Sequence, residues 1–440
     1  MTQAVAGDAR RAISRDTGRR GRNQLQQSSR TKVPTLLTLG VAWLLIVDSL
    51  TRVSAGPLSL SGALTLATAL LCAFLSPIII LGRTSQKSGS GRATIPWPLT
   101  AFVVVALIAL AMEPSAEGLQ NVAVYTIFVA SAGLTSVQVS RAGAQAIGHR
   151  MRLVGLIVTC AFIVTNLAGF RLFSERAFGL VGLIFLAVLI PNTPRRKIVR
   201  LAPFLVAGAI ALSLSRTATV IAIAMLMFLA LRARKGLKLL ASLGMAVAAG
   251  GLAYWLFNFY EPFRERFLEG DGGATVGGVE LNTSGRAVLW DITYKSSQEA
   301  PVFGHGPGSA SALITPLFRN IGHPHNEYLR ILHDFGWVGL VLFGLGMVML
   351  LTRIAARIRR SGDPIHWSAL LSLVAVLSAA ITDNVIVYPF IMLPLGLIIG
   401  ASLGLPLEPE SEPEPSHGVG SPRIEDARRN TISGTPRARN

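Results

Sequence analysis

Four of the seven histidines lie in one segment, residues 304–339, which reads GHGPGSASALITPLFRNIGHPHNEYLRILHDFGWVG. An imidazole has a pKa near 6.5, so histidine is the usual general base at neutral pH. His325 directly precedes an apolar run, and a helix that starts there would hold its side chain in place. His325 is therefore the candidate base, whereas His305, His323 and His333 are expected to shape the loop.

Two other roles stay open for these histidines. They could hold a zinc ion, with His305, His323 and His325 as ligands, or they could only hydrogen-bond the loop into shape. Catalytic and structural zinc sites commonly show an HExxH motif or cysteine ligands, and this segment has neither. Cys72 and Cys160 lie in apolar runs elsewhere in the chain. We therefore expect no metal and no cofactor.

Three glycines of the GHGPG motif, Gly304, Gly306 and Gly308, predict a tight turn with close approach of the backbone. A phosphate-binding Walker A loop would require GxxxxGK[ST], and no lysine follows here. A dinucleotide fold would require a βαβ unit, which the surrounding apolar runs do not predict. The motif therefore indicates loop geometry and not a nucleotide pocket.

Arginines close to apolar runs form a second set of candidates: Arg171, Arg176, Arg216 (after Ser215), Arg264, Arg266, Arg286 and Arg330. The planar fork of a guanidinium meets two phosphate oxygens at once, so these residues are candidates for binding a phosphate group. The alternative for each is a snorkelling side chain or a salt bridge to a nearby carboxylate.

The composition predicts the elements that must position these residues. The chain is 51% hydrophobic and only 15% charged, where soluble proteins carry roughly 25% charged residues. Apolar runs of about 18 residues or more recur, and each is long enough to cross a bilayer. A β-barrel would instead alternate in segments of about ten residues. We therefore predict an all-α, polytopic membrane protein.

We place about twelve transmembrane helices, at residues 33–52, 59–82, 95–112, 120–138, 152–170, 177–191, 198–214, 217–232, 237–257, 333–353, 365–383 and 386–405. Together they make a membrane domain over residues 33–405. One large outer (periplasmic or extracellular) loop, about 258–332, separates the ninth and tenth spans. In the tenth span, Gly336 and Gly339 suit close helix packing. The basic segment 1–32 and the Pro- and Glu-rich segment 406–440 are expected to be disordered.

The net charge of +18 raises the question of a nucleic-acid partner. Lysine and arginine instead recur in every second loop, as the positive-inside rule requires of cytoplasmic loops. Examples are the clusters at 195–200 and 353–360. This pattern places both termini in the cytoplasm and the 258–332 loop outside, in a multi-pass protein of the cell membrane with no nucleic-acid partner.

Taken in order, the motifs resemble those of the O-antigen ligase/polymerase family of membrane glycosyltransferases, the Wzy/WaaL-like group. A Ser-Arg pair precedes a span, an SGR…W element and GHGPG follow in the outer loop, and HNEYL stands before a Gly-rich span. The residues that carry the resemblance are Ser215, Arg216, Ser284, Gly285, Arg286, Trp290, His325, Asn326, Gly336 and Gly339.

The resemblance implies a metal-independent, inverting transfer of a glycan from an undecaprenyl-pyrophosphate carrier to an acceptor hydroxyl. It assigns the base to His325, in the His325–Asn326 pair, and the grip on the pyrophosphate to Arg216 and Arg286. The implied partners are a lipid-linked oligosaccharide, a glycan or other hydroxyl acceptor, membrane lipids and polysaccharide assembly proteins. A polymerase and a ligase would use the same kind of site, so both activities remain open.

Two other classes of function are compatible with a polytopic chain. A small-solute transporter would carry ionisable residues within its spans, but few exist: Asp48 and Asp383 near span ends, and Asp334 at the loop edge. A flippase, or a scaffold of a polysaccharide assembly complex, would make the histidines dispensable.

Overall fold

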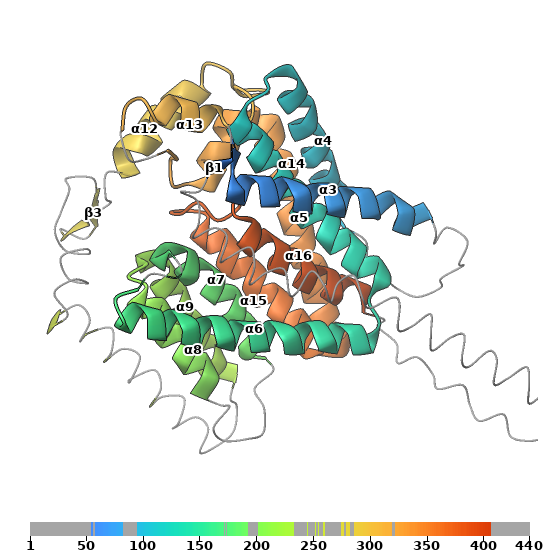
Figure 1. The fold of residues 1–440 in the computed structure, drawn as a ribbon, viewed down its shortest axis with the longest axis vertical. Helices are drawn as coiled ribbons and strands as arrows, with labels where there is room; N and C mark the ends of the chain where they lie inside the picture. Colours follow the sequence, from blue (N-terminus) through green and yellow to red (C-terminus); the bar gives the residue numbers. More distant parts are fainter. Residues whose placement is uncertain are drawn as a thin grey trace, which may run out of the picture.

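The structure is a computed structural model of the chain. It describes residues 54–55, 58–81, 95–170, 172, 174–191, 201–232, 244, 251, 254, 258–259, 274–276, 279–281, 286–318 and 322–405. The predicted span 33–52, nearly all of the predicted span 237–257, the two terminal segments, Arg171, Arg264 and Arg266 lie outside the described residues. Within the described part, the fold is helical with two short β-hairpins (Figure 1).

The helices preceding the outer loop are α3 (Leu60–Leu81), α4 (Trp97–Met112), α5 (Ala116–Gln138), α6 (Arg141–Leu167), α7 (Glu175–Leu189), α8 (Ala202–Leu212) and α9 (Arg216–Arg232). Two short helices lie within the loop, α12 (Arg286–Ser297) and α13 (Ser309–Ile314), and the helices α14 (Glu327–Ser361), α15 (Pro364–Ala379) and α16 (Pro389–Gly404) come after them. The strands β1 (Ser54–Ala55) and β2 (Leu58–Ser59) pair antiparallel, as do β3 (Ala274–Val276) and β4 (Val279–Leu281).

Ten of the predicted spans correspond to helices α3–α9 and α14–α16. Three of these helices, α5, α6 and α14, are long and apolar enough to cross a membrane, by length and composition. Others, such as α4, α15 and α16, are apolar but have only 16 residues. At 1.5 Å per residue such a helix is about 24 Å long, short of the roughly 30 Å hydrocarbon core. The helical class is confirmed, while the count of twelve spans stays a prediction.

Small residues let α16 pack directly against α5. A Cβ atom added at Gly396, Gly400 or Gly404 would collide with Ser131, Ala132 or Ser136 of α5. These glycines recur every fourth residue, so they form one face of α16, the small-residue face by which membrane helices approach closely. All residues of α16 are buried, which makes it the central helix of the bundle in Figure 1.

Gly336 breaks the regular helix of α14. Its φ of 62° and ψ of −165° are accessible only to glycine, and an added Cβ would collide with the backbone of Val302. The amides of Trp337 and Val338 bond to the carbonyls of Pro301 and Val302, at 2.8 and 3.1 Å. The expectation that Gly336 serves helix packing is therefore wrong. It opens a kink into which the outer loop inserts, whereas Gly339 does pack against Phe335 and Phe102.

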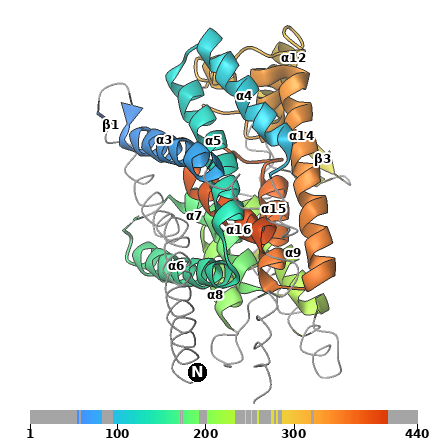
Figure 2. The same ribbon diagram turned by 90° about the vertical axis from the view of Figure 1, so that its right-hand side faces the viewer.

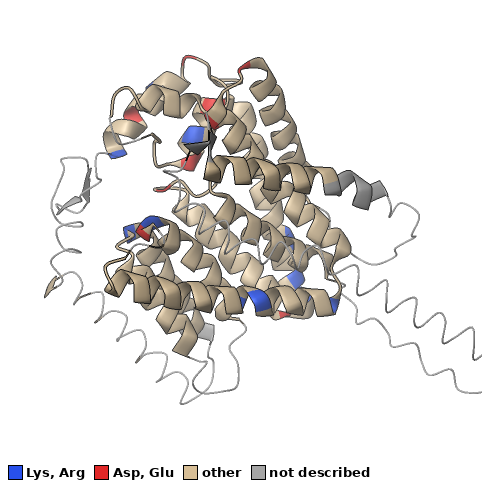
Figure 3. Ribbon diagram, in the orientation of Figure 1, with Lys and Arg blue, Asp and Glu red and all other residues tan. Residues whose placement is uncertain are grey.

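Charged residues gather near the helix ends. In Figure 3, long stretches of helix carry no Lys, Arg, Asp or Glu. One end of the bundle, at which α5, α7, α9 and α14 begin, is called here the site end. The opposite end carries basic residues, in the first turns of α6 and the last turns of α14. Figure 2 shows α14 running along the side of the molecule from α12 at the site end.

Candidate functional site

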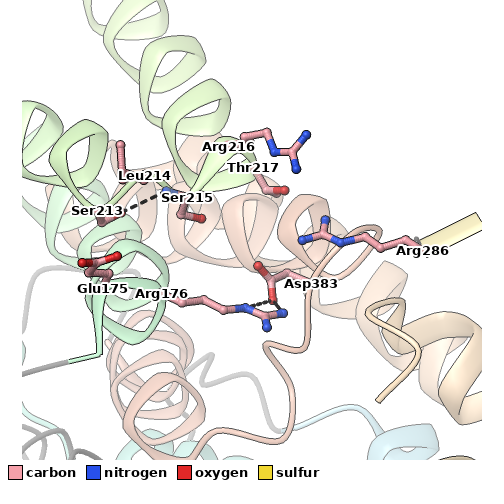
Figure 4. Close-up of a pocket in the computed structure, with 9 residues that line it drawn as sticks. All are labelled: Glu175, Arg176, Ser213, Leu214, Ser215, Arg216, Thr217, Arg286 and Asp383. Carbon is pink, nitrogen blue, oxygen red and sulfur yellow. Dashed lines mark hydrogen bonds and ion pairs between the residues drawn. The ribbon is translucent and has the colours of Figure 1, made fainter. Parts of the chain in front are cut away.

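A cavity of about 240 Å³ lies at the site end. We call it the arginine pocket, because three guanidinium groups line it (Figure 4). Its residues come from the start of α7, the α8–α9 turn, the start of α12 and the turn after α15: Glu175, Arg176, Ser213, Leu214, Ser215, Arg216, Thr217, Arg286 and Asp383. Pockets for whole drug-sized ligands begin at roughly 300 Å³, so this one suits a single charged group of a larger substrate.

Three helices begin at this pocket. The first residues of α7, α9 and α12 are Glu175, Arg216 and Arg286, and all three line the cavity. A helix N-terminus carries a partial positive charge and unpaired N–H groups, which favour anions. Backbone and side chains therefore contribute positive potential at the same place.

Arg176 connects the pocket to His325. Its Nε donates to Oδ1 of Asp383 at 2.7 Å, and its Nη2 also bonds to Asp383. The same Nη2 lies 2.7 Å from Nδ1 of His325. Asp383 is held in turn by the backbone amide of Asn384, at 2.8 Å. The carboxylate thus orients the guanidinium, and the guanidinium contacts the imidazole.

Two residues of the site carry strained backbone. Leu214 and His325, with φ of 54° and 55°, are the non-glycine residues with positive φ in the described part of the chain. Leu214 lines the pocket and His325 contacts Arg176. Such backbone costs about 1–3 kcal/mol and clusters at functional sites. The strain therefore marks the same place as the charges do.

The environment keeps His325 neutral. Burial, followed by the charges of Arg176 and Arg286 and by His323, lowers the pKa of His325 to about 3. Burial also lowers the pKa of His323 to about 4, with Arg330 and Arg176 adding to the effect. At neutral pH both imidazoles are therefore neutral, and one ring nitrogen of each carries a lone pair.

Hydrogen bonds fix α9 and α12, the helices that begin with Arg216 and Arg286, to the turn after α15. Nη1 of Arg286 donates to the carbonyl of Thr382 at 2.7 Å. The hydroxyl of Thr382 lies 2.6 Å from that of Thr217, the neighbour of Arg216. Thr382 therefore ties α9 and α12 to the segment that presents Asp383.

The structure brings Ser215, Arg216 and Arg286 into the pocket and His325 to its edge. It uses Asn326 differently: Oδ1 of Asn326 caps α14 by accepting from the amide of Leu329, at 3.1 Å. That cap fixes where α14 begins and hence where His325 lies. The side-chain oxygen of Asn326 therefore positions the start of α14.

Arg330 does not reach the pocket. It is 1% exposed, and its guanidinium bonds to Glu327 and, at 2.8 Å, to the hydroxyl of Tyr125. Asp334 lies 3.7 Å from its Nη1. We call these four residues the Arg330 cluster. The expectation that Arg330 grips a phosphate is corrected, because carboxylates inside the bundle already take its charge.

The Arg330 cluster holds the GHGPG loop. Asp334 accepts from the amides of Gly308 and Ala310, at 3.1 and 2.9 Å, and from the hydroxyl of Ser309. Gly304, Gly306 and Gly308 have φ between 74° and 87°, a conformation that favours glycine. A Cβ at Gly304 would collide with the backbone of Asp334. The motif thus forms the tight turn with close backbone approach that its glycines predict.

The remaining histidines of the segment fasten loop to helix. Nε2 of His305 and Nε2 of His333 both contact Ser296 at the end of α12, at 2.9 and 3.1 Å. The two rings lie 4.7 Å apart. His323 lies 3.3 Å from Glu117 at the start of α5. These contacts support the loop-shaping role that the sequence predicts for them.

Two residues that complete the site, Arg176 and Asp383, belong to none of the sequence motifs. Arg176 stands at the start of a span, where the sequence leaves phosphate binding and a snorkelling role both open. Asp383 reads as one acidic residue near a span end. Their pairing joins positions 207 residues apart, and only an arginine and a carboxylate at equivalent ends of two spans could have hinted at it.

The apolar helices and the arginine pocket define a membrane protein with a site suited to an anionic group. Residues 201–344 match the model of a family described as O-antigen ligase. The resemblance drawn from the motifs is thereby confirmed over this segment, which contains Arg216 and His325; Arg176 and Asp383 lie outside it. None of the curated proteins compared with the chain matches it.

Proposed function

We propose that this protein transfers a glycan from a polyprenyl-diphosphate carrier to an acceptor hydroxyl, as a polymerase or ligase of a surface polysaccharide. The observation that carries the proposal is the arginine pocket, where Arg176, Arg216 and Arg286 meet at three helix N-termini beside a neutral His325. The match to an O-antigen ligase model supports the same class of reaction.

The pocket binds the diphosphate of the donor in this proposal. Arg216 and Arg286 stabilise the charge that develops on the departing diphosphate, because preorganised cations lower the free energy of such a transition state. Ser215 and Thr217 add hydroxyl groups to the same wall. The small volume suits a diphosphate, with the lipid and the glycan extending beyond it.

His325 removes the proton from the acceptor hydroxyl. The acceptor oxygen then forms a bond to the anomeric carbon while the bond from that carbon to the diphosphate oxygen breaks. The leaving diphosphate carries away the electron pair, and the proton remains on the imidazole until solvent takes it. Attack from the face opposite the leaving group inverts the anomeric configuration.

The location follows from charge and hydropathy. We place the chain in the cell membrane as a multi-pass protein whose domain spans residues 33–405, with the loop 258–332 on the outer face and both termini in the cytoplasm. Basic residues in the first turns of α6 and the last turns of α14 lie opposite the site end, in agreement with the positive-inside rule. The site then faces outward, where a lipid-linked donor presents its glycan.

The experiment is transfer by purified protein in lipid vesicles containing a polyprenyl-diphosphate glycan and an acceptor glycan. His325→Ala should lower the transfer rate by roughly 10²–10⁴-fold, the contribution of a general base. The matched control is His149→Ala, at an exposed histidine of α6, with an unchanged rate. Full activity of the His325→Ala protein, inserted and folded, would remove the base from the mechanism.

A further inference from the structure

Arg176 occupies a position that no motif assigns. Its side chain is 36% exposed, while that of its partner Asp383 is 3% exposed. The guanidinium is therefore paired with a buried carboxylate. It lines the arginine pocket, and its Nη2 contacts His325. Of the residues lining the pocket, Arg176 is the one whose hydrogen bond to His325 the structure records.

The contact dictates which nitrogen of His325 carries the proton. A guanidinium has five N–H donors and no acceptor, so Nδ1 must accept the hydrogen bond from Arg176. A neutral imidazole has a single N–H, which then lies on Nε2. In this arrangement His325 presents a donor at Nε2, and its only lone pair is covered by Arg176.

This tautomer is the opposite of the one that a catalytic triad uses for its general base. In a serine-protease triad, an aspartate accepts from Nδ1–H and leaves the Nε2 lone pair free. Here a cation stands where that aspartate would be, and the carboxylate, Asp383, lies behind the cation. His325 can take a proton at Nδ1 only after Arg176 withdraws from it.

Resting on the proposed function, we propose that Arg176 is a positioning residue that couples donor binding to the base: a diphosphate in the pocket draws the Arg176 guanidinium off Nδ1 of His325 and uncovers the lone pair. The driving force is charge, because a diphosphate outcompetes a neutral imidazole for a guanidinium. Asp383 keeps hold of Nε, so the guanidinium turns without leaving the site. His325 then receives the acceptor's proton at Nδ1 and becomes an imidazolium with both nitrogens protonated.

Nitrogen NMR tests this coupling on the full-length protein, labelled with ¹⁵N-histidine and held in lipid nanodiscs at neutral pH. The chemical shifts of Nδ1 and Nε2 distinguish the two tautomers, and the His325 signal is identified by its loss in His325→Gln. Inorganic pyrophosphate is the probe, and its binding is measured separately by calorimetry.

We expect the Nε2–H tautomer in the empty protein and a shift of the Nδ1 signal once pyrophosphate saturates the pocket. In Arg176→Gln the empty protein should already lack the fixed tautomer, and the ligand-dependent shift should be lost. Lys295→Gln, on the exposed face of α12, should behave as the wild type does.

An Nδ1–H tautomer in the empty protein would overturn the coupling. So would an unchanged His325 signal under saturating, calorimetrically measured pyrophosphate. Absence of pyrophosphate binding would instead contradict the pocket of the proposed function. The tautomers of the empty wild type and Arg176→Gln would still decide whether Arg176 sets the proton of His325.

Discussion

The arginine pocket and the Arg330 cluster lie at the same end of the bundle and use arginine in opposite ways. Arg330 is 1% exposed and has two carboxylates, Glu327 and Asp334, within 4 Å. In the pocket, three arginines share one cavity with Glu175 and Asp383. The first site has an excess of carboxylates over arginines, and the second has an excess of arginines.

This difference separates an arginine that stabilises the fold from arginines that can bind a ligand. A buried guanidinium whose charge is already balanced has nothing to offer a ligand, but its removal leaves buried carboxylates unpaired. Arginines that outnumber the carboxylates at an open cavity have the opposite property, because their positive potential favours an anionic ligand. Glu327 links the two sites, since its Oε1 accepts from the amide of Ile386, near Asp383 in the turn after α15.

The largest effect is expected at the Arg330 cluster. Arg330→Ala leaves the fully buried side chains of Glu327 and Asp334 without their cation, and should lower the free energy of unfolding by about 3–5 kcal/mol. Thermal unfolding in detergent measures this. The matched control is Arg359→Ala, at an exposed position late in the same helix, with a change of less than about 0.5 kcal/mol. Equal stability of the two variants would erase the distinction between the sites.

At the arginine pocket the effect should fall on the reaction. Arg216→Ala should lower the transfer rate by about 10²–10³-fold, as the loss of one preorganised donor to the leaving group does. The unfolding midpoint should stay near that of the wild type. Arg216→Lys should recover only part of the rate, because a lysine lacks the planar fork. An inactive but also unfolded Arg216→Ala would place Arg216 with Arg330 as a fastening residue.

The kink that joins the outer loop to α14 gives a smaller, structural effect. Gly336→Ala forces positive φ on a residue with a Cβ atom that meets the backbone of Val302. We expect a loss of about 1–3 kcal/mol in unfolding free energy. Gly344→Ala, in the same helix with nothing within 4 Å of an added Cβ, should be neutral or stabilising by up to about 1 kcal/mol. A destabilised Gly344→Ala would show that α14 tolerates no alanine at its glycines.

The last effect concerns pH. Burial and the charges of Arg176 and Arg286, with His323 beside it, lower the pKa of folded His325 to about 3, against about 6.5 in the unfolded chain. Between these values the unfolded chain binds the extra proton, so stability falls as the pH drops below about 6.5. His325→Gln should therefore lose less stability between pH 7.5 and 5 than the wild type does. An equal loss would mean that His325 is not neutral in the folded state.

Much of the fold could be predicted because its signals are local. Apolar runs placed ten helices, and the residue types near their ends singled out Arg216 and His325. Arg286 lies in the outer loop, and the family resemblance singled it out. The boundaries were less exact: α6 begins at Arg141 and α14 at Glu327, each before the predicted span. Polar first turns hide a helix start when hydropathy is the signal, although the caps at Ser140 and Asn326 could have revealed both.

The sequence by itself determined a helical membrane chain with an arginine- and histidine-bearing loop, because hydropathy and residue type act within one segment. Only the tertiary structure decided which arginine serves which purpose. Arg330 and Arg216 are both arginines in the first two turns of a helix, and nothing local separates them. Arg330 meets carboxylates inside the bundle, while Arg216 meets an open cavity. Arg176 and His325, 149 residues apart, become partners through helix packing, because the free energy of a charge depends on what surrounds it.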